Sequence, residues 1–246
     1  GTVSQDIAGS VDYHSVYMHL TATDLAFRVR VNDIDGGTDA SNYEFKNFIF
    51  VGVDADVNGS IDFFMGLYNP TGNNGRLGIY QSYPTYANEG PSSTGIDGKP
   101  FLAYKPELNV NYNIKKAESS INADPDYYIS FSFSMADITT AFARNGFVFD
   151  STTPFRFMTG TASQDNSFNQ DLNGMDRIGW TSGGTLNSLG VYSKTVTAAE
   201  GGFSSLYHTV AFDKNTGDSA PIPDAKSVAT NTMLGTLPAP SLMTKK

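Results

Sequence analysis

The sequence has no cysteine among its 246 residues. This absence excludes disulfide bonds, zinc sites with thiolate ligands and catalysis by a thiol. No run of 18 apolar residues occurs, so we expect no membrane-spanning helix. Basic residues number 16 against 25 acidic residues and form no run longer than a lysine pair. Because the net charge is −9, the chain has no electrostatic reason to bind nucleic acid.

Recognisable catalytic motifs are lacking as well. Glycosidases place two carboxylates on either side of the scissile bond, but the few glutamates here are scattered along the chain. The three histidines have no metal-ligand spacing, and neither a Gly-x-Ser-x-Gly motif nor a phosphate-binding loop is present. We therefore predict that the protein is not an enzyme and has no catalytic residues.

What the chain does contain favours β-structure. It has 17 phenylalanines and 13 tyrosines, which are strand formers, and 24 glycines, which supply turns. Aspartate outnumbers glutamate by 20 to 5. Aspartate is typical of turns and of calcium ligation, whereas glutamate is typical of helix surfaces.

Apolar residues alternate with polar ones in residues 24–31 and 127–135, which predicts half-buried antiparallel strands. Residues 47–53 and 61–68 are apolar on both faces, so we expect them to be central strands of a meander that continues into residues 76–81. Residues 82–126 look irregular, and residues 147–150 look like a strand. The sequence predicts an all-β protein, a single β-sandwich of jelly-roll type.

One short helix is expected at residues 135–144. Ser134 can cap its first turn, Asp137 lies three residues later, and Asn145-Gly146 follows its end. From residue 219 the chain is rich in proline and has no sustained periodicity. We predict a sandwich domain over residues 1–218 and an irregular C-terminal tail over residues 219–246.

The stretch VDADVNGSIDFF joins the two most apolar strands and is the strongest candidate site. Oxygen ligands at positions 1, 3, 5 and 9 of a loop, with glycine at position 6, resemble the first part of an EF-hand calcium loop. The predicted calcium ligands are Asp54, Asp56, Asn58 and Asp62. Position 12 is Met65 instead of glutamate and the flanks are strands, so the stretch is not an EF-hand.

The same stretch has a second interpretation as a two-residue type I′ hairpin turn at Asn58-Gly59, because Asn-Gly between alternating strands is a strong signal for that turn. Three carboxylates within nine residues repel one another unless a cation is present. This repulsion favours calcium.

Two weaker acidic clusters are present. A second metal site is predicted at Asn169, Asp171, Asn173 and Asp176, which nearly repeat the first pattern. The other cluster comprises Asp33, Asp35 and Asp39. Each is also typical of a polar loop.

Exposed aromatic rings could stack on sugars. Trp180, Tyr83 and Tyr86 lie in or near irregular segments and are the candidates for ligand stacking. The alternative, which we favour, is that most of these rings pack in the core or at sheet edges.

Two longer stretches, FIFVGVDADVNGSIDFFMGLYN and PFRFMTGTASQDNSFNQDLNG, together resemble uncharacterised exported bacterial surface proteins of the PEP-CTERM-associated type. The resemblance covers about residues 25–190. It implies export and a β-sandwich, and it implies no activity. The chain differs from that group at its end, where LPAPSLMTKK has no hydrophobic segment after Pro-Ala-Pro.

Together these features predict a non-enzymatic extracellular or cell-surface structural protein, such as a matrix protein, stabilised by calcium. Its subunits would join into a homopolymeric fibre by β-strand addition through the terminal segments 1–12 and 219–246. The alternative is a carbohydrate-binding module that contacts surface polysaccharide.

Overall fold

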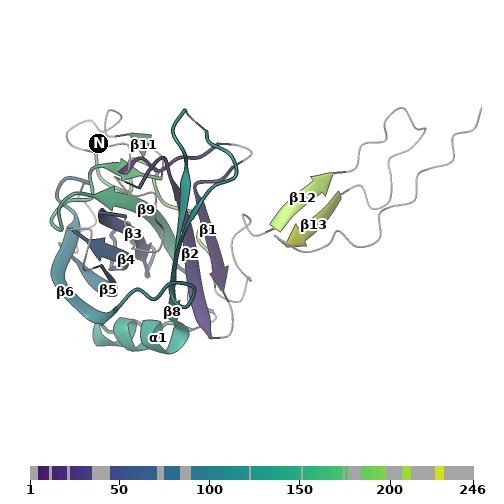
Figure 1. Cartoon of the computed structure of the whole chain (residues 1–246). Coiled ribbons are helices and arrows are strands. Elements are labelled where there is room, and N and C mark those ends of the chain that lie inside the picture. Colours follow the sequence, from purple (N-terminus) through teal and green to yellow (C-terminus); the bar gives the residue numbers. More distant parts are fainter. Residues whose placement is uncertain are drawn as a thin grey trace, which may run out of the picture. The chain divides into compact units, whose positions relative to one another are not determined.

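The computed structural model describes twelve stretches of the chain: residues 5–10, 13–20, 23–34, 45–70, 75–83, 90–121, 123–150, 152–173, 175–176, 184–197, 207–211 and 225–229. Two antiparallel sheets pack together into a β-sandwich, as the sequence predicts (Figure 1). The jelly-roll connectivity remains a prediction.

The smaller sheet has four strands in the order β1-β2-β8-β7. Alternation of apolar residues produces it: Leu25, Phe27 and Val29 of β2 are buried, and so are Ile129 and Phe131 of β8. The strands are β1 (Val16–Leu20), β2 (Asp24–Val31), β7 (Tyr112–Lys116) and β8 (Tyr127–Ser134).

The larger sheet has seven strands in the order β11-β10-β9-β3-β4-β5-β6. Its centre is the predicted meander, in which β3 pairs with β4 and β4 with β5. The strands are β3 (Asn47–Asp54), β4 (Phe63–Asn69), β5 (Arg76–Tyr83), β6 (Gly95–Tyr104), β9 (Arg156–Ala162), β10 (Asp171–Leu172) and β11 (Met175–Asp176).

Both faces of the larger sheet are buried, which explains why β3 and β4 are apolar throughout. The inner face packs on the smaller sheet, where the rings of Phe27 and Phe157 lie 6.2 Å apart. On the outer face, Phe50 meets the rings of Tyr80 and Phe168 at 5.4 Å each. Segments from the 160s to the 190s cover this outer face and contribute Phe168, Leu172, Leu186 and Val191 to a second core.

Gly66 lets β3 and β4 approach closely beside this second core. A Cβ atom at that position would lie 2.1 Å from the carbonyl oxygen of Ile49. Because such a contact cannot form without moving backbone, only glycine fits here.

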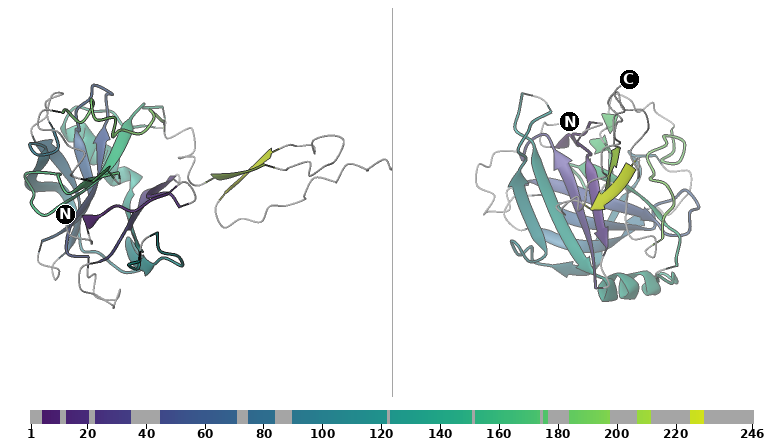
Figure 2. Two further views of the ribbon diagram at one scale, coloured as in Figure 1. Left: turned by 90° about the horizontal axis from the view of Figure 1, so that it is seen from above. Right: turned by 90° about the vertical axis from the view of Figure 1, so that its right-hand side faces the viewer.

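The helix α1 (Met135–Arg144) has the predicted bounds and lies at one end of the sandwich (Figures 1 and 2). Ser134 is its N-cap and accepts a hydrogen bond from the backbone N–H of Asp137 at 3.1 Å. Phe142 on its buried face stacks on Phe63 of β4 with ring centroids 3.9 Å apart.

Two segment predictions were wrong. The stretch expected to be irregular contains β6 and β7, and residues 147–150 form no strand. β6 carries Pro100, and its pairing with β5 shifts register twice, so its sequence lacks clean alternation.

The segment before β1 packs on its own domain and touches both sheets. On the four-stranded sheet, Ala8 donates its backbone N–H to the carbonyl of Arg30 at 3.0 Å. On the seven-stranded sheet, the N–H of Ile7 donates to Asp171 Oδ2 at 3.2 Å, and Thr161 donates its hydroxyl to the carbonyl of Gln5 at 2.6 Å. Ile7 is 2% exposed.

Contacts divide the chain into one unit over Gly1–Gly202 and a second over Phe203–Lys246. The second unit contains an antiparallel pair of strands, β12 (Tyr207–Ala211) and β13 (Ala225–Ala229). β13 lies within the segment predicted to be an irregular tail. No helix in the described part of the chain is long and apolar enough to cross a membrane.

Candidate functional site: an acidic loop between β3 and β4

The predicted calcium ligands lie on the loop that connects two central strands. The last paired residues of β3 and β4 in this ladder are Val53 and Phe63, so the connection spans Asp54 to Asp62. Val57 and Gly59 have positive φ angles of 59° and 101°. A type I′ turn needs a positive φ angle at both central residues, which here would be Asn58 and Gly59. The φ angle of Asn58 is not positive. The two-residue hairpin interpretation is therefore wrong.

Carboxylates at the two ends of this loop fix its backbone. Asp54 accepts the backbone N–H of Asn58 at its Oδ1 (3.0 Å) and that of Gly59 at its Oδ2 (2.9 Å). Asp62 accepts the backbone N–H of Ala55 at 2.7 Å. Backbone N–H groups of the loop therefore hold both carboxylates in place.

The middle of the loop is closed by short-range contacts. Asp56 accepts the backbone N–H of Asn58 at 3.1 Å and its side-chain amide at 2.9 Å. The amide oxygen of Asn58 in turn accepts the backbone N–H of Ser60 at 2.8 Å. Asn58 thus shapes the loop through both its side-chain nitrogen and its side-chain oxygen.

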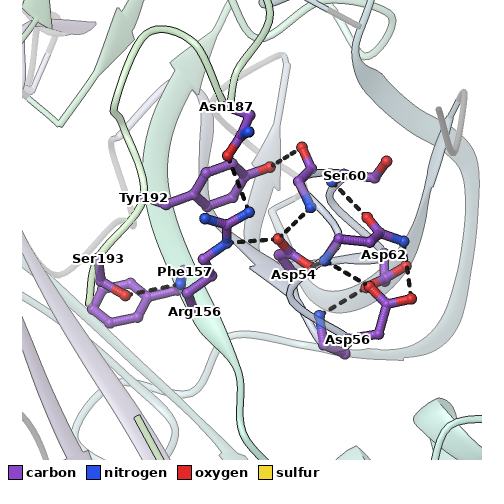
Figure 3. Close-up of polar contacts among 12 residues, drawn as sticks. Asp54, Asp56, Ser60, Asp62, Arg156, Phe157, Asn187, Tyr192 and Ser193 are labelled. Atoms are coloured by element: carbon purple, nitrogen blue, oxygen red, sulfur yellow. Dashed lines mark hydrogen bonds and ion pairs between the residues drawn. The ribbon is translucent and has the colours of Figure 1, made fainter. Parts of the chain in front are cut away.

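Arg156, at the start of β9, joins the loop to a distant segment (Figure 3). Its Nε lies 2.7 Å from Asp54 Oδ2, and its terminal nitrogen donates to Asn187 Oδ1 at 3.1 Å. The guanidinium lies 4.4 Å from the ring centroid of Tyr192, whose hydroxyl donates to the carbonyl of Gly59 at 3.2 Å. One negative charge of the loop therefore has a fixed counter-ion.

Carboxylate oxygens of Asp54, Asp56 and Asp62 all lie within 4.8 Å of one another. Asp54 is 0% and Asp62 is 7% exposed, whereas Asp56 is exposed. Burial raises the pKa of Asp62 from 3.8 to about 7, and the nearby charges of Asp56 and Asp54 act in the same direction. The loop thus gathers negative charge that Arg156 offsets only in part, and it has the donor set that a hard cation prefers.

The second predicted metal cluster has visible structural roles. Asp171 is 1% exposed and accepts the N–H of Ile7. Asn173 accepts hydrogen bonds from the backbone and hydroxyl of Thr159 and donates to the carbonyl of Val191. Asn169 accepts a hydrogen bond from the side chain of Gln170. The side chain of Asp176 is not among those that the structure describes.

The other predicted residues are dispersed or lie outside the described stretches. Tyr83 is 65% exposed at the end of β5. Tyr86, Trp180, Asp35 and Asp39 fall outside the described residues. The Oδ1 of Asp33 accepts the backbone N–H of Ile34 at 2.7 Å.

Sequence reasoning missed the partners of the loop, namely Arg156, Asn187 and Tyr192. They lie far from the loop in the sequence, with 102 positions between Asp54 and Arg156. One signal was available, because Arg156 is the only charged residue in a strand that is otherwise apolar or small.

Comparison of the chain with models of protein families, with curated proteins and with solved structures found no significant match. The resemblance to exported surface proteins therefore stays a prediction, and the case for a function depends on the chain's own residues.

Proposed function

We propose that this chain is a non-enzymatic structural module of the cell surface or extracellular matrix, stabilised by calcium bound at the loop of Asp54, Asp56 and Asp62. The observation that carries the proposal is the convergence of three carboxylates within 4.8 Å, two of them buried. A cation there would remove a repulsion that folding otherwise has to overcome.

The donor set also supports the location. The position at which an EF-hand supplies a bidentate glutamate is Met65, and Arg156 already offsets one carboxylate. Fewer charged ligands mean weaker binding, and extracellular calcium modules work at about 10⁻⁴–10⁻³ M. Such a site would be filled outside the cell.

Thermal unfolding with and without calcium tests the proposal. A ligand that binds only the folded state at 100 times its Kd adds about 2.7 kcal/mol of stability. For a chain of this size, each kcal/mol raises Tm by about 2–4 °C. We expect Asp56→Asn to abolish the calcium-dependent rise, and the exposed control Asp124→Asn to keep it. An identical Tm in calcium and in excess chelator would refute the calcium site.

We infer that the second unit mediates self-association. Its described sheet has only two strands, and a two-stranded hairpin is at best marginally stable alone. Both strands have an edge that the other does not pair, and a strand from another copy can complete such an edge. The N-terminal segment is a weaker candidate, because Gln5 and Ile7 are buried in their own sandwich.

Deleting residues 203–246 tests this assembly by light scattering in the presence of calcium. We expect the full chain to form larger particles and the truncated chain to remain a monomer with the same Tm. If both run as monomers at high protein concentration, the fibre proposal fails while the calcium proposal stands.

A further inference from the structure

A groove of about 270 Å³ lies on the four-stranded sheet, and neither the acidic loop nor the proposed calcium takes part in it. It lies between that sheet and the turn before β7. Its lining comprises Ala26, Asn109, Val110, Asn111, Tyr112, Asn113, Ser130, Phe131 and Ser132. The right panel of Figure 2 shows this sheet facing the viewer.

The strand register explains why the sheet is hollowed here. Ser130 lies opposite Arg28 on one side and Asn113 on the other, and Ser132 lies opposite Ala26. These residues alternate with the inward-facing Phe131, so they share the outer face of the sheet. Small side chains on β2 and β8 form the floor, and the larger amides of Asn113 on β7 and of Asn109 and Asn111 in the turn before it form one wall.

The wall is preorganised by its own hydrogen bonds. Asn109 has a φ of 61°, and its backbone N–H donates to the carbonyl of Tyr112 at 2.8 Å. Asn111 accepts the N–H of Glu107 at 2.7 Å through its side chain, and its carbonyl accepts the N–H of Ser132 at 2.9 Å. The turn thus holds Val110 at the rim, where this side chain is 73% exposed.

The lining is uncharged, and it includes hydroxyl and amide groups that both donate and accept hydrogen bonds. Ser130 accepts from Arg28 Nε at 3.1 Å, which leaves its own hydroxyl proton free to donate. Ser132 Oγ makes no hydrogen bond to another described residue, and the Asn113 amide donates only to Asn109. Hydroxyl and amide groups of this kind match the hydroxyls of a sugar.

We propose that this groove binds a neutral oligosaccharide. No lining residue carries a charge that would select a charged ligand. The strands of the floor, β2 and β8, are each paired on both sides, so the floor offers an extended peptide no free strand edge. No aromatic ring on the outer face of the lining offers a stacking platform, so the affinity rests on hydrogen bonds. We therefore expect millimolar affinity for a single chain.

Amide chemical shifts of the full-length protein test the proposal, since NMR titration detects weak binding. The probes are neutral hexasaccharides of β-1,4-glucose, β-1,3-glucose and mannose, with an acidic uronate hexamer as the charged comparison. We expect at least one neutral probe to shift the resonances of residues 109–113 and 130–132, and the uronate to leave them unchanged.

A matched pair of variants then separates this groove from other surfaces. Ser132→Tyr places a large side chain across the floor, and tyrosine is favoured in strands. Lys115→Tyr introduces the same residue at an exposed position of β7 that does not line the groove. We expect the first to weaken binding at least tenfold and the second to retain it. The proposal is overturned if no neutral probe shifts these resonances, or if both variants bind equally well.

Discussion

Asp62 makes the metal-free protein sensitive to pH. Its pKa is about 7 in the folded chain, against an ordinary value of 3.8. Between these values the folded state retains a proton that the unfolded state has released. Stability is therefore greatest below the unfolded pKa and decreases as pH rises toward 7, by up to about 1.4 kcal/mol per pH unit for one group.

We therefore expect Asp62→Asn to flatten the pH dependence between pH 4 and 7. Urea unfolding of both proteins in calcium-free buffer measures this, and the difference between them removes the contributions of other carboxylates. Saturating calcium should abolish the wild-type decline, because the cation favours the charged form. Equal slopes for the two proteins would contradict the burial-raised pKa.

Arg30 shows where sequence reasoning fails for a single residue, because its burial depends on partners far away in the sequence. Alternation along residues 24–31 predicts that Arg30 lies on the opposite face of β2 from Val29, a face that would ordinarily be solvated. Instead Arg30 is 0% exposed, because its Nε lies 2.6 Å from Asp126 and its terminal nitrogen donates to the carbonyl of Ser119. Periodicity identifies the two faces of a strand, but it cannot show that a segment about 90 positions later covers one of them.

At the scale of elements, local signals sufficed wherever the structure is local. The helix was predictable because its cap, its apolar stripe and its end all lie within 13 residues, Ser134 to Gly146. The acidic loop was found for the same reason. The contacts of Arg156 and Tyr192 with the loop could not be predicted, because they require β9 and a later segment to pack beside the loop.

The helix cap provides a prediction at this scale. Ser134→Ala removes the hydrogen bond to the N–H of Asp137, and loss of such a cap costs about 1 kcal/mol. Ser134→Asp should retain most of the stability, because aspartate caps equally well and its charge suits a helix N-terminus. Chemical denaturation measures both. If both substitutions cost the same, the hydroxyl does not act as a cap.

At the scale of the whole molecule, the sandwich followed from composition and alternation, but the sheet order did not. β3, β4 and β5 are neighbours in sequence and in space, whereas β9 joins β3 from a hundred residues away. The apolar outer faces of β3 and β4 indicated that something covers them, but the sequence did not show which segments form the second core. What covers them comes from segments rich in serine, asparagine and glycine, whose sequence shows no periodicity.

The segment before β1 ties the two sheets together, and this gives the prediction for the whole fold. Ile7 is buried between hydrogen bonds to β2 on one sheet and to β9 and β10 on the other. Truncating a buried isoleucine to alanine lowers the free energy of unfolding by about 2–5 kcal/mol. Here the truncation also weakens the packing of the segment that bonds to both sheets.

We expect Ile7→Ala to lower the free energy of unfolding by that amount in urea. Val148→Ala serves as the control, because Val148 is 76% exposed and surface substitutions change stability by less than about 0.5 kcal/mol. Hydrogen exchange should be faster in β2 and in β9 and β10 of the Ile7 variant, since the segment before β1 bonds to these strands. If Ile7→Ala lowers the free energy of unfolding no more than the control does, the packing of the two sheets does not depend on the segment before β1.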